Sequence, residues 1–219
     1  MIVREFYRGP IEGAKMRLQT NDQTNGPTGD FWGFMGPDLG ADASLKNFLE
    51  SPDHKLVYEK RNLIVKDMSI LLARLVKDNQ EPPQGAYVLA VGTGDTGWDP
   101  MNPPAATDEQ RALENEIERK TFADTQFIDS GGSPVAYPTK IVDFITTFSE
   151  SEAVGPLVEM GLLGGNISTN LSIKNPVPAG AYDDTVDLTS YETMLNYLTF
   201  PVINKPATAT LTWVWRLTF

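Results

Sequence analysis

The strictest pattern in the sequence is an alternation that runs through its last nine residues. Every second position holds a bulky apolar side chain, in the order Leu211, Trp213, Trp215, Leu217 and Phe219. The positions between them hold Thr212, Val214, Arg216 and Thr218. Because side chains alternate between the two faces of a strand, this pattern predicts one apolar, aromatic face and one mostly polar face. Two tryptophans on one face need a large partner surface, so we expect this strand to pair into a sheet.

Several other segments are typical of strands. They are short, rich in apolar or β-branched residues and bounded by turn-forming residues. These segments cover residues 86–91, 120–129, 140–148, 153–163 and 194–200. The run from Gly131 to Pro134 separates the second from the third, as expected of a turn. Most of the second half of the chain is therefore predicted to be β-structure.

Two segments have the features of helices. Residues 63–77 place apolar side chains on one helical face, at Ile64, Met68, Leu71, Leu72 and Leu75. Pro82 and Pro83 then stop this helix. A second helix is predicted to begin at Thr107, which has capping-box spacing to Gln110. The predicted fold class is α+β and mainly β: an antiparallel β-sandwich with two short helices and an extended N-terminal arm.

The N-terminal part of the chain differs from the rest because glycine, proline, asparagine and aspartate recur closely in it. It is nevertheless rich in aromatic residues, which are scarce in disordered tails. We therefore predict an irregular arm over residues 1–60 and a helix-plus-sandwich domain over residues 61–219. The arm offers candidate partner contacts at Phe6, Tyr7, Phe31, Trp32 and Phe34. The alternative is a long loop that packs on its own domain.

The composition excludes several kinds of chemistry. The chain has no cysteine and one histidine, His54, so thiol chemistry is excluded and a multi-histidine metal site cannot form. The formal net charge of −11 disfavours nucleic acid as a partner. No apolar run is long enough for a membrane span, and the first residues do not read as a signal peptide. The absence of cysteine suits assembly in a reducing cytoplasm.

One loop matches a cofactor motif only in its letters. Residues 92–97 read G-x-G-x-x-G directly after a predicted strand, as in a dinucleotide-binding fingerprint. That chemistry requires a helix to follow, and Pro100 prevents one. Asp95, Asp99 and Asn102 could bind a cation, but their spacing differs from that of an EF-hand, and a solvated loop is the preferred interpretation. We predict no catalytic residue, no cofactor and no metal site.

Four segments together resemble a family of structural proteins from the virions of tailed bacteriophages. The first two run from Asn62 through Leu75 and from Ala90 through Thr96. The third runs from Thr107 through Lys120. The last joins Phe200-Pro201-Val202-Ile203-Asn204-Lys205 to the stretch from Thr210 to Phe219. The resemblance does not cover residues 1 to about 60, and it carries no catalytic residue over to this chain.

The resemblance implies a non-enzymatic structural component of a tailed-phage virion, assembled in the host cytoplasm. Within that class we expect a capsid cement or decoration protein that binds capsomers, as a homo-oligomer such as a trimer. Its partners would be the major capsid protein or tail and neck proteins, with no nucleic acid and no membrane. One alternative is a neck, baseplate or tail-fibre adaptor. Another is a host-carbohydrate-binding module that uses an exposed tryptophan such as Trp32 or Trp98.

Overall fold

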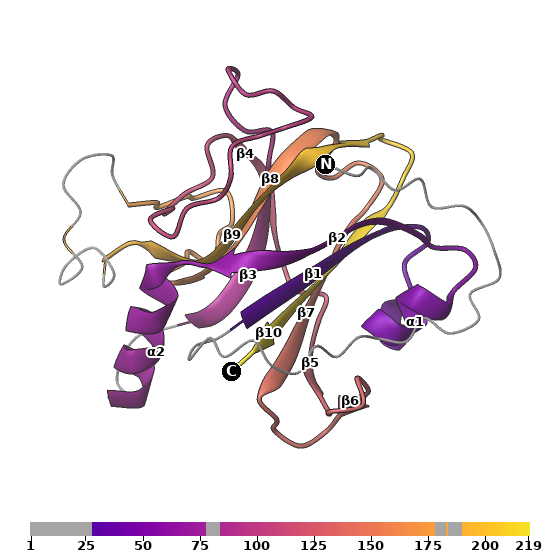
Figure 1. Ribbon diagram of the computed structural model, residues 1–219, viewed down its shortest axis with the longest axis horizontal. Coiled ribbons are helices and arrows are strands. Elements are labelled where there is room, and N and C mark those ends of the chain that lie inside the picture. Colours follow the sequence, from indigo (N-terminus) through magenta and orange to yellow (C-terminus); the bar gives the residue numbers. More distant parts are fainter. Residues whose placement is uncertain (1–27, 78–83, 178–182, 184–189) are drawn as a thin grey trace.

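The computed structural model of the chain describes residues 28–77, 84–177, 183 and 190–219 (Figure 1). Its two α-helices are α1 (Leu45–Glu50) and α2 (Lys66–Lys77), and a 3-10 turn, η1 (Gly40–Asp42), precedes α1. The first five strands are β1 (Thr28–Met35), β2 (Lys55–Ile64), β3 (Gln84–Gly92), β4 (Glu116–Thr121) and β5 (Asp124–Ile128). The others are β6 (Pro134–Val135), β7 (Ile141–Phe148), β8 (Gly155–Gly165), β9 (Glu192–Lys205) and β10 (Leu211–Thr218).

The strands form two antiparallel sheets that pack as a sandwich, which confirms the predicted fold class. Sheet A has the order β2-β1-β10-β7-β5-β6, and sheet B has the order β4-β3-β8-β9. Strand β2 joins them, because its last residues Leu63 and Ile64 pair with Tyr197 and Asn196 of β9. The ten strands therefore form one continuous series of hydrogen-bonded neighbours that folds over on itself. Strands β4 and β6 lie at its two ends.

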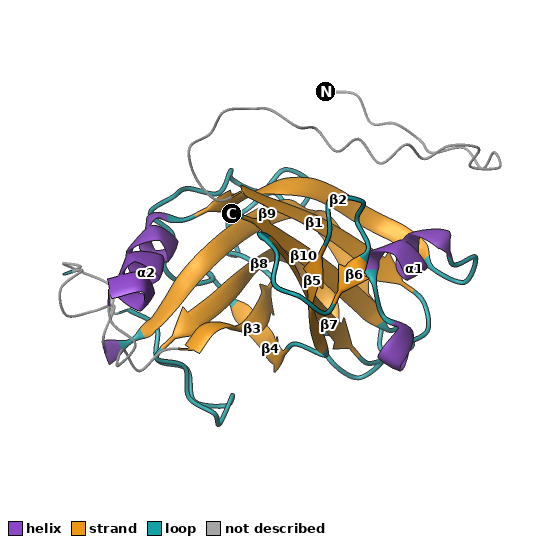
Figure 2. Ribbon diagram, turned by 90° about the horizontal axis from the view of Figure 1, so that it is seen from below, coloured by secondary structure: helices purple, strands orange, loops and turns teal. Residues whose placement is uncertain are grey.

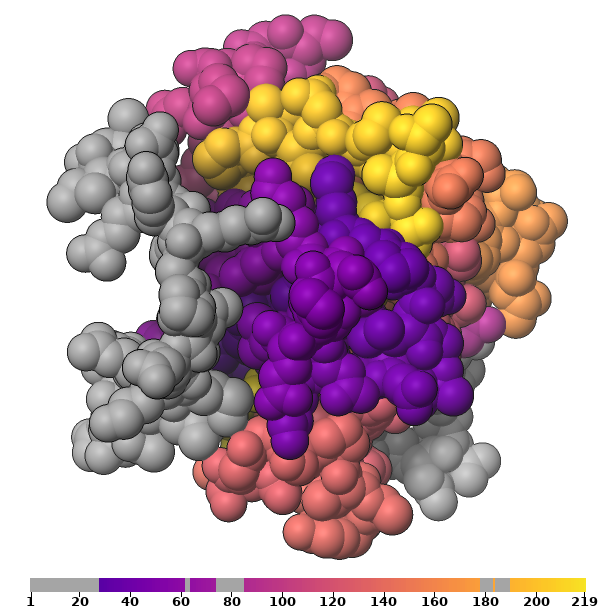
Figure 3. Space-filling model, turned by 90° about the vertical axis from the view of Figure 1, so that its right-hand side faces the viewer, coloured from indigo at the N-terminus to yellow at the C-terminus, as the bar shows by residue number. Residues whose placement is uncertain are grey.

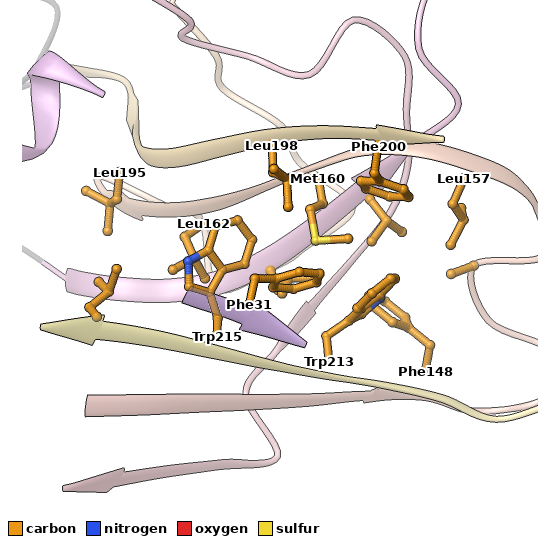
Figure 4. Packing of buried hydrophobic residues seen from close by; sticks show 14 of the residues in the cluster. Phe31, Phe148, Leu157, Met160, Leu162, Leu195, Leu198, Phe200, Trp213 and Trp215 are labelled. Carbon is orange, nitrogen blue, oxygen red and sulfur yellow. The ribbon is translucent and has the colours of Figure 1, made fainter. Parts of the chain in front are cut away.

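The core lies between the two sheets (Figure 4). Sheet A contributes Phe31, Trp213 and Trp215, all of them 0% exposed. Their rings meet at centroid distances of 4.7 Å for Phe31–Trp213 and 5.0 Å for Phe31–Trp215. Phe200 of sheet B faces Trp213 at 5.9 Å. The apolar face predicted for the last strand thus packs on the opposite sheet across the core, except at Phe219, which follows β10 and is 47% exposed.

The polar face predicted for the last strand is buried as well. Seven of the eight residues of β10 are buried, including Thr212, Val214 and Arg216. Helix α1 covers Val214 with Leu45 and Phe48. The helix begins at Ser44, whose Oγ accepts the N–H of Asn47 at 3.2 Å. The outer face of sheet A is therefore covered at one end by a helix that the sequence did not predict.

Residues 28–60 are not an arm. Strand β1 lies between β2 and β10 and pairs with both along its length. Figure 3 shows the segment from residue 28 onwards in the middle of one face of the molecule, next to the C-terminal segment. The predicted boundary at residue 60 is therefore wrong, because β1 and β2 are part of sheet A. Turn-forming residues marked the ends of these strands, and β1 shows no alternation because its aromatic residues lie on both faces, Phe31 on one and Trp32 and Phe34 on the other.

The prediction of a second helix, beginning at Thr107, is also wrong. Residues 107–115 form turns and irregular structure, and β4 begins at Glu116. The N–H groups of Glu114 and Asn115 donate to the buried side chain of Glu159 at 3.0 and 2.8 Å. Leu113, 9% exposed, packs into the core beneath them. Tertiary hydrogen bonds and burial thus outweigh the local capping signal, which contributes only about 1 kcal/mol.

The first predicted helix is present but starts later than predicted. Leu63 and Ile64 end strand β2, and α2 begins at Lys66. The N–H of Val65 donates to the carbonyl of Leu195 in β9 at 3.3 Å, so the chain stays extended up to that point. Figure 2 shows α1 and α2 at opposite ends of the sandwich. Neither helix has the length and apolar character needed to cross a membrane, among the residues that the structure describes.

The segment predicted as one strand over residues 120–129 is two strands in different sheets. Strand β4 pairs with β3 in sheet B, whereas β5 pairs with β7 in sheet A. The chain crosses between the sheets at Phe122 and Ala123. The Phe122 ring packs 4.8 Å from that of Phe144, and the N–H of Ala123 donates to the carbonyl of Ile145 at 2.7 Å. These contacts hold the crossover.

Candidate functional site: a charged ladder on sheet A

Four neighbouring strands place charged residues in a single row on the outer face of sheet A. Asp143 of β7 lies opposite Arg216 of β10, Arg216 lies opposite Asp30 of β1, and Asp30 lies opposite Arg61 of β2. We call these four residues the charged ladder. Its signs alternate, and opposite charges in directly facing cross-strand positions stabilise a sheet.

The ladder is buried at its β7–β10 end. Asp143 is 0% exposed and Arg216 is 7% exposed. The Arg216 guanidinium donates to both carboxylate oxygens of Asp143, through Nε at 2.6 Å and Nη2 at 2.7 Å. Burial raises the pKa of Asp143, and the hydrogen bonds from Arg216 oppose that rise. This two-bond arrangement fixes the geometry of both side chains.

The ladder is open to solvent at its β1–β2 end. Asp30 and Arg61 have side-chain exposures of 41% and 56%, and their charged atoms are 3.9 Å apart. Burial raises the pKa of Asp30 despite the nearby arginines, Arg61 and Arg216. The neighbouring row adds Trp32, which is half-buried, and Glu59, which is exposed. We call Asp30, Trp32, Glu59 and Arg61 the exposed end of the ladder.

The indole of Trp32 is held on both sides. Its Nε1–H donates to Oε1 of Glu59 at 3.1 Å. The guanidinium carbon of Arg216 lies 5.4 Å from the centroid of the ring, within the range of a cation–π interaction. Arg216 of the buried Asp143–Arg216 pair thus contacts the half-buried ring of Trp32. The result is a surface patch with one aromatic ring among charged side chains.

A second polar cluster surrounds Glu159, which is 0% exposed on β8. One carboxylate oxygen accepts the N–H groups of Gly94 at 3.1 Å and Asn115 at 2.8 Å. The other accepts the N–H of Glu114 at 3.0 Å and the hydroxyl of Tyr197 at 2.7 Å. Burial raises the pKa of Tyr197, and the adjacent carboxylate reinforces this effect. Four donors occupy this carboxylate, so its role is to hold two loops on sheet B.

A third cluster joins β4 to β9. The Arg119 guanidinium, with 3% side-chain exposure, makes paired hydrogen bonds to Glu116 and Glu192, all between 2.6 and 2.9 Å. Lys174 donates to the carbonyl of Glu116 and forms an ion pair with its carboxylate, both at 3.1 Å. The positive charges of Arg119 and Lys174 thus face the carboxylates of Glu116 and Glu192. The arrangement ties an end strand of the hydrogen-bonded order to the rest of sheet B.

The predicted partner-contact residues separate into three groups. Phe31 and Phe34 are 0% and 1% exposed, so their prediction as arm contacts is wrong. Trp32 lies on the face of β1 opposite Phe31, next to Phe34, and belongs to the exposed end of the ladder. Phe6 and Tyr7 lie outside the described residues. Sequence reasoning missed Asp143 and Arg216 as a pair, although an arginine in a strand with buried neighbours is the signal that could have marked it.

The glycine-rich loop at residues 92–97 forms a tight turn. Gly94 has a φ of +66°, and a Cβ there would collide with Trp98 and Val158. The turn continues with the N–H of Trp98 donating to the carbonyl of Asp95 at 3.0 Å, and no helix follows. The Asp95 carboxylate accepts the N–H of Gly97 at 2.7 Å. Within the described residues, no three acidic or histidine side chains are grouped to hold a metal ion.

His54 has a structural environment in the loop that follows α1. Its Nε2 lies 2.6 Å from the carbonyl of Pro37, and its Nδ1 lies 2.8 Å from Oγ of Ser51. The ring packs edge-on to Phe48 at 5.1 Å. Both ring nitrogens thus hold the loop around α1.

Comparisons with known proteins give no match, either to models of protein families or to curated proteins.

Proposed function

We propose that this protein is a non-enzymatic structural component of a tailed-phage virion, and within that class a capsid cement or decoration protein. The four segments that resemble virion proteins support the class. Much of those segments is buried: Val65, Leu71 and Val91 belong to the core, as do Phe200 and Trp213. The resemblance therefore concerns the sandwich itself, and the binding role has to come from the surface.

The hydrogen bonds and ion pairs of the buried ionisable groups favour a binding role over a catalytic one. Glu159 accepts four hydrogen bonds, Arg119 faces two carboxylates, and Asp143 is paired through both oxygens. A general acid or base must exchange a proton with a substrate, which requires free hydrogen-bonding capacity. These groups instead rigidify the sheets. The charged and aromatic side chains at the exposed end of the ladder face solvent, which suits recognition of another molecule.

In this proposal the protein binds capsomers and stabilises the shell as a homo-oligomer, such as a trimer at local three-fold positions. Of the predicted arm contacts, Phe6 and Tyr7 fall in residues 1–27, outside the described residues, and in this proposal they contact a neighbouring subunit. Localisation on intact virions by antibody labelling and electron microscopy tests the proposal. Label spread over the icosahedral shell supports it. Label confined to the neck or the tail tip overturns the capsid role and supports a tail or baseplate adaptor.

The arm has its own test. We expect a chain that lacks residues 1–27 to keep the sandwich and to bind assembled particles more weakly than the full chain. Circular dichroism and thermal unfolding check the fold, and co-sedimentation with particles that lack this protein checks binding. Equal binding by the two chains would show that residues 1–27 do not grip a neighbour.

A second candidate function, binding of host carbohydrate, is favoured by the exposed end of the ladder. Trp32 is oriented by Glu59 and Arg216, and charged groups that can hydrogen-bond sugar hydroxyls surround it. Titration of host surface polysaccharide by calorimetry tests this function. We expect Trp32→Ala to abolish binding and Trp98→Ala, at another half-buried tryptophan, to leave it intact. Equal loss in both variants, or no heat with the unaltered chain, would reject it.

A further inference from the structure

Strand β2 has an edge that the described part of the chain leaves open. From Lys55 to Arg61 it pairs with β1 on one side, and its pairing with β9 begins at Leu63. Over residues 55–61, β2 and β9 are not paired. There the Lys60 ammonium bridges the two strands by donating to the carbonyl of Thr199 at 3.4 Å. Within the described residues no strand pairs with this side of residues 55–61, so backbone N–H and C=O groups there point away from β1 without a strand beside them.

Specific contacts cover parts of the other edges of the sandwich. At β4, the Lys174 side chain takes up the carbonyl of Glu116. At the opposite end, β6 is two residues long and begins with Pro134, which cannot donate a hydrogen bond. At the end of β9, the N–H of Val202 donates to the carbonyl of Pro100 at 2.8 Å. Compared with β6, β2 is long and its side chains at residues 55, 56 and 59–61 are exposed, while a register shift at Val57 interrupts its pairing with β1.

The side chains of the β2 edge carry the opposite charge to the protein. Lys55, Lys60 and Arg61 are exposed and basic, against one acid, Glu59, in a chain of net charge −11. An exposed apolar side chain, Leu56 (41% exposed), lies between the bases. Such an edge attracts an acidic strand. It disfavours self-pairing, because an antiparallel match of residues 55–61 would bring Lys55 of one copy opposite Arg61 of the other.

We infer that β2 is a strand-addition site for an extended acidic segment of a partner protein. Main-chain hydrogen bonds to the open edge supply the affinity, and Lys55, Lys60 and Arg61 select acidic side chains. This inference stands apart from the proposed location on a virion, since any extended acidic segment meets the same edge. It assigns the chain a binding mode that uses the backbone of sheet A.

The test uses the full chain and a labelled ten-residue peptide of alternating glutamate and valine. We expect the peptide to slow amide hydrogen exchange at residues 55–61 and to bind with an affinity that fluorescence polarisation can measure. The same peptide with every second amide N-methylated keeps its charge but loses the N–H donors along one edge of the strand. We therefore expect it not to bind. Equal binding of both peptides would overturn the inference, because it would show attraction by charge alone.

Charge variants give the matched control. We expect Lys55→Glu with Lys60→Glu to weaken peptide binding by about tenfold or more. Lys46→Glu with Lys140→Glu makes the same change in net charge at exposed sites outside β2, so we expect an affinity within about twofold of the unaltered chain. An equal loss in the two double variants would overturn the inference.

Two other occupants of the edge have distinct signatures. If residues 1–27 of the same chain cover it, residues 55–61 are already protected from exchange in the free protein and lose that protection when residues 1–27 are deleted. If a second copy covers it, the protection grows with protein concentration in the absence of peptide. Either result overturns the inference. Residues that exchange freely until the peptide is added support it.

Discussion

Strands β10 and β2 belong to the same sheet, with only β1 between them, yet they have opposite environments. Seven of the eight residues of β10 are buried, whereas Lys55, Glu59, Lys60 and Arg61 of β2 are exposed. Both strands carry an arginine in the charged ladder. Arg216 is enclosed and paired through two hydrogen bonds, and Arg61 approaches Asp30 at 3.9 Å in solvent. The same residue type thus stabilises the fold in one strand and remains available to a partner in the other.

The largest expected effect comes from replacing each of these two arginines in turn. We expect Arg216→Met to lower the free energy of unfolding by about 3–5 kcal/mol, because it leaves the buried Asp143 carboxylate without a counter-charge. Arg61→Met, the matched exposed control, should cost about 0–1 kcal/mol. Urea denaturation followed by tryptophan fluorescence measures both. Equal effects would show that the ladder is uniform along its length.

A second pair compares a buried glutamate with an exposed one. In Glu159→Gln the amide nitrogen replaces an oxygen that accepts two hydrogen bonds. We expect a loss of about 2–4 kcal/mol, since each hydrogen bond to a charged group contributes about 1.5–3 kcal/mol. Glu59→Gln should stay within about 0.5 kcal/mol, because Trp32 is its partner at the surface. A thermal unfolding series separates these outcomes, and a neutral Glu159→Gln would argue against the role of Glu159 in holding the two loops.

A third pair probes how closely β1 packs on β10. A Cβ at Gly33 would collide with the ring of Trp213, so we expect Gly33→Ala to cost about 1–3 kcal/mol. At Gly85 of β3 a Cβ would meet no heavy atom within 4 Å, and Gly85→Ala should change the stability by less than about 0.5 kcal/mol. Chemical denaturation checks both. A tolerated Gly33→Ala would mean that the Trp213 ring can move within the core.

The smallest expected effect is a pH dependence at the exposed end of the ladder. Because burial raises the pKa of Asp30, the folded protein binds this proton more tightly than the unfolded chain does. The contribution of Asp30 to stability should therefore increase as the pH falls from neutrality towards 3.8. Asp30→Asn lacks this contribution. Unfolding curves of both proteins between about pH 7 and pH 4 should show the unaltered protein gaining relative to the variant, and a relative loss would contradict a raised pKa at Asp30.

Periodicity in the sequence predicted the strands that lie deepest in the fold. The alternation over Leu211–Thr218 and the apolar run around Leu89 and Met160 each mark a face that must leave water, so their pattern is visible without a structure. The helix α2 was predicted for the same reason. Strands β1 and β2 were missed because their turn-forming and charged residues are typical of loops, and only pairing with β10 makes β1 a central strand.

The polar clusters could not be predicted from spacing. Asp143 and Arg216 are far apart in the chain, as are Glu159 and its donors in residues 94–115, and no local pattern connects them. The predicted helix at Thr107 failed for that reason, since the donors that it would have used internally are taken by Glu159. The exposed end of the ladder was foreseen only as Trp32, without the neighbours that orient it.

The sequence by itself determined that the chain forms an antiparallel sandwich with an aromatic core, because side-chain period and apolar burial are local properties of each segment. It also determined the chemical inventory, with no cysteine, one histidine and an acidic balance. Only the tertiary structure decided which charged residues are buried in pairs and which are exposed on β2. Those assignments depend on the register between strands and on the layer above each face, and both are set by contacts between residues distant in the chain.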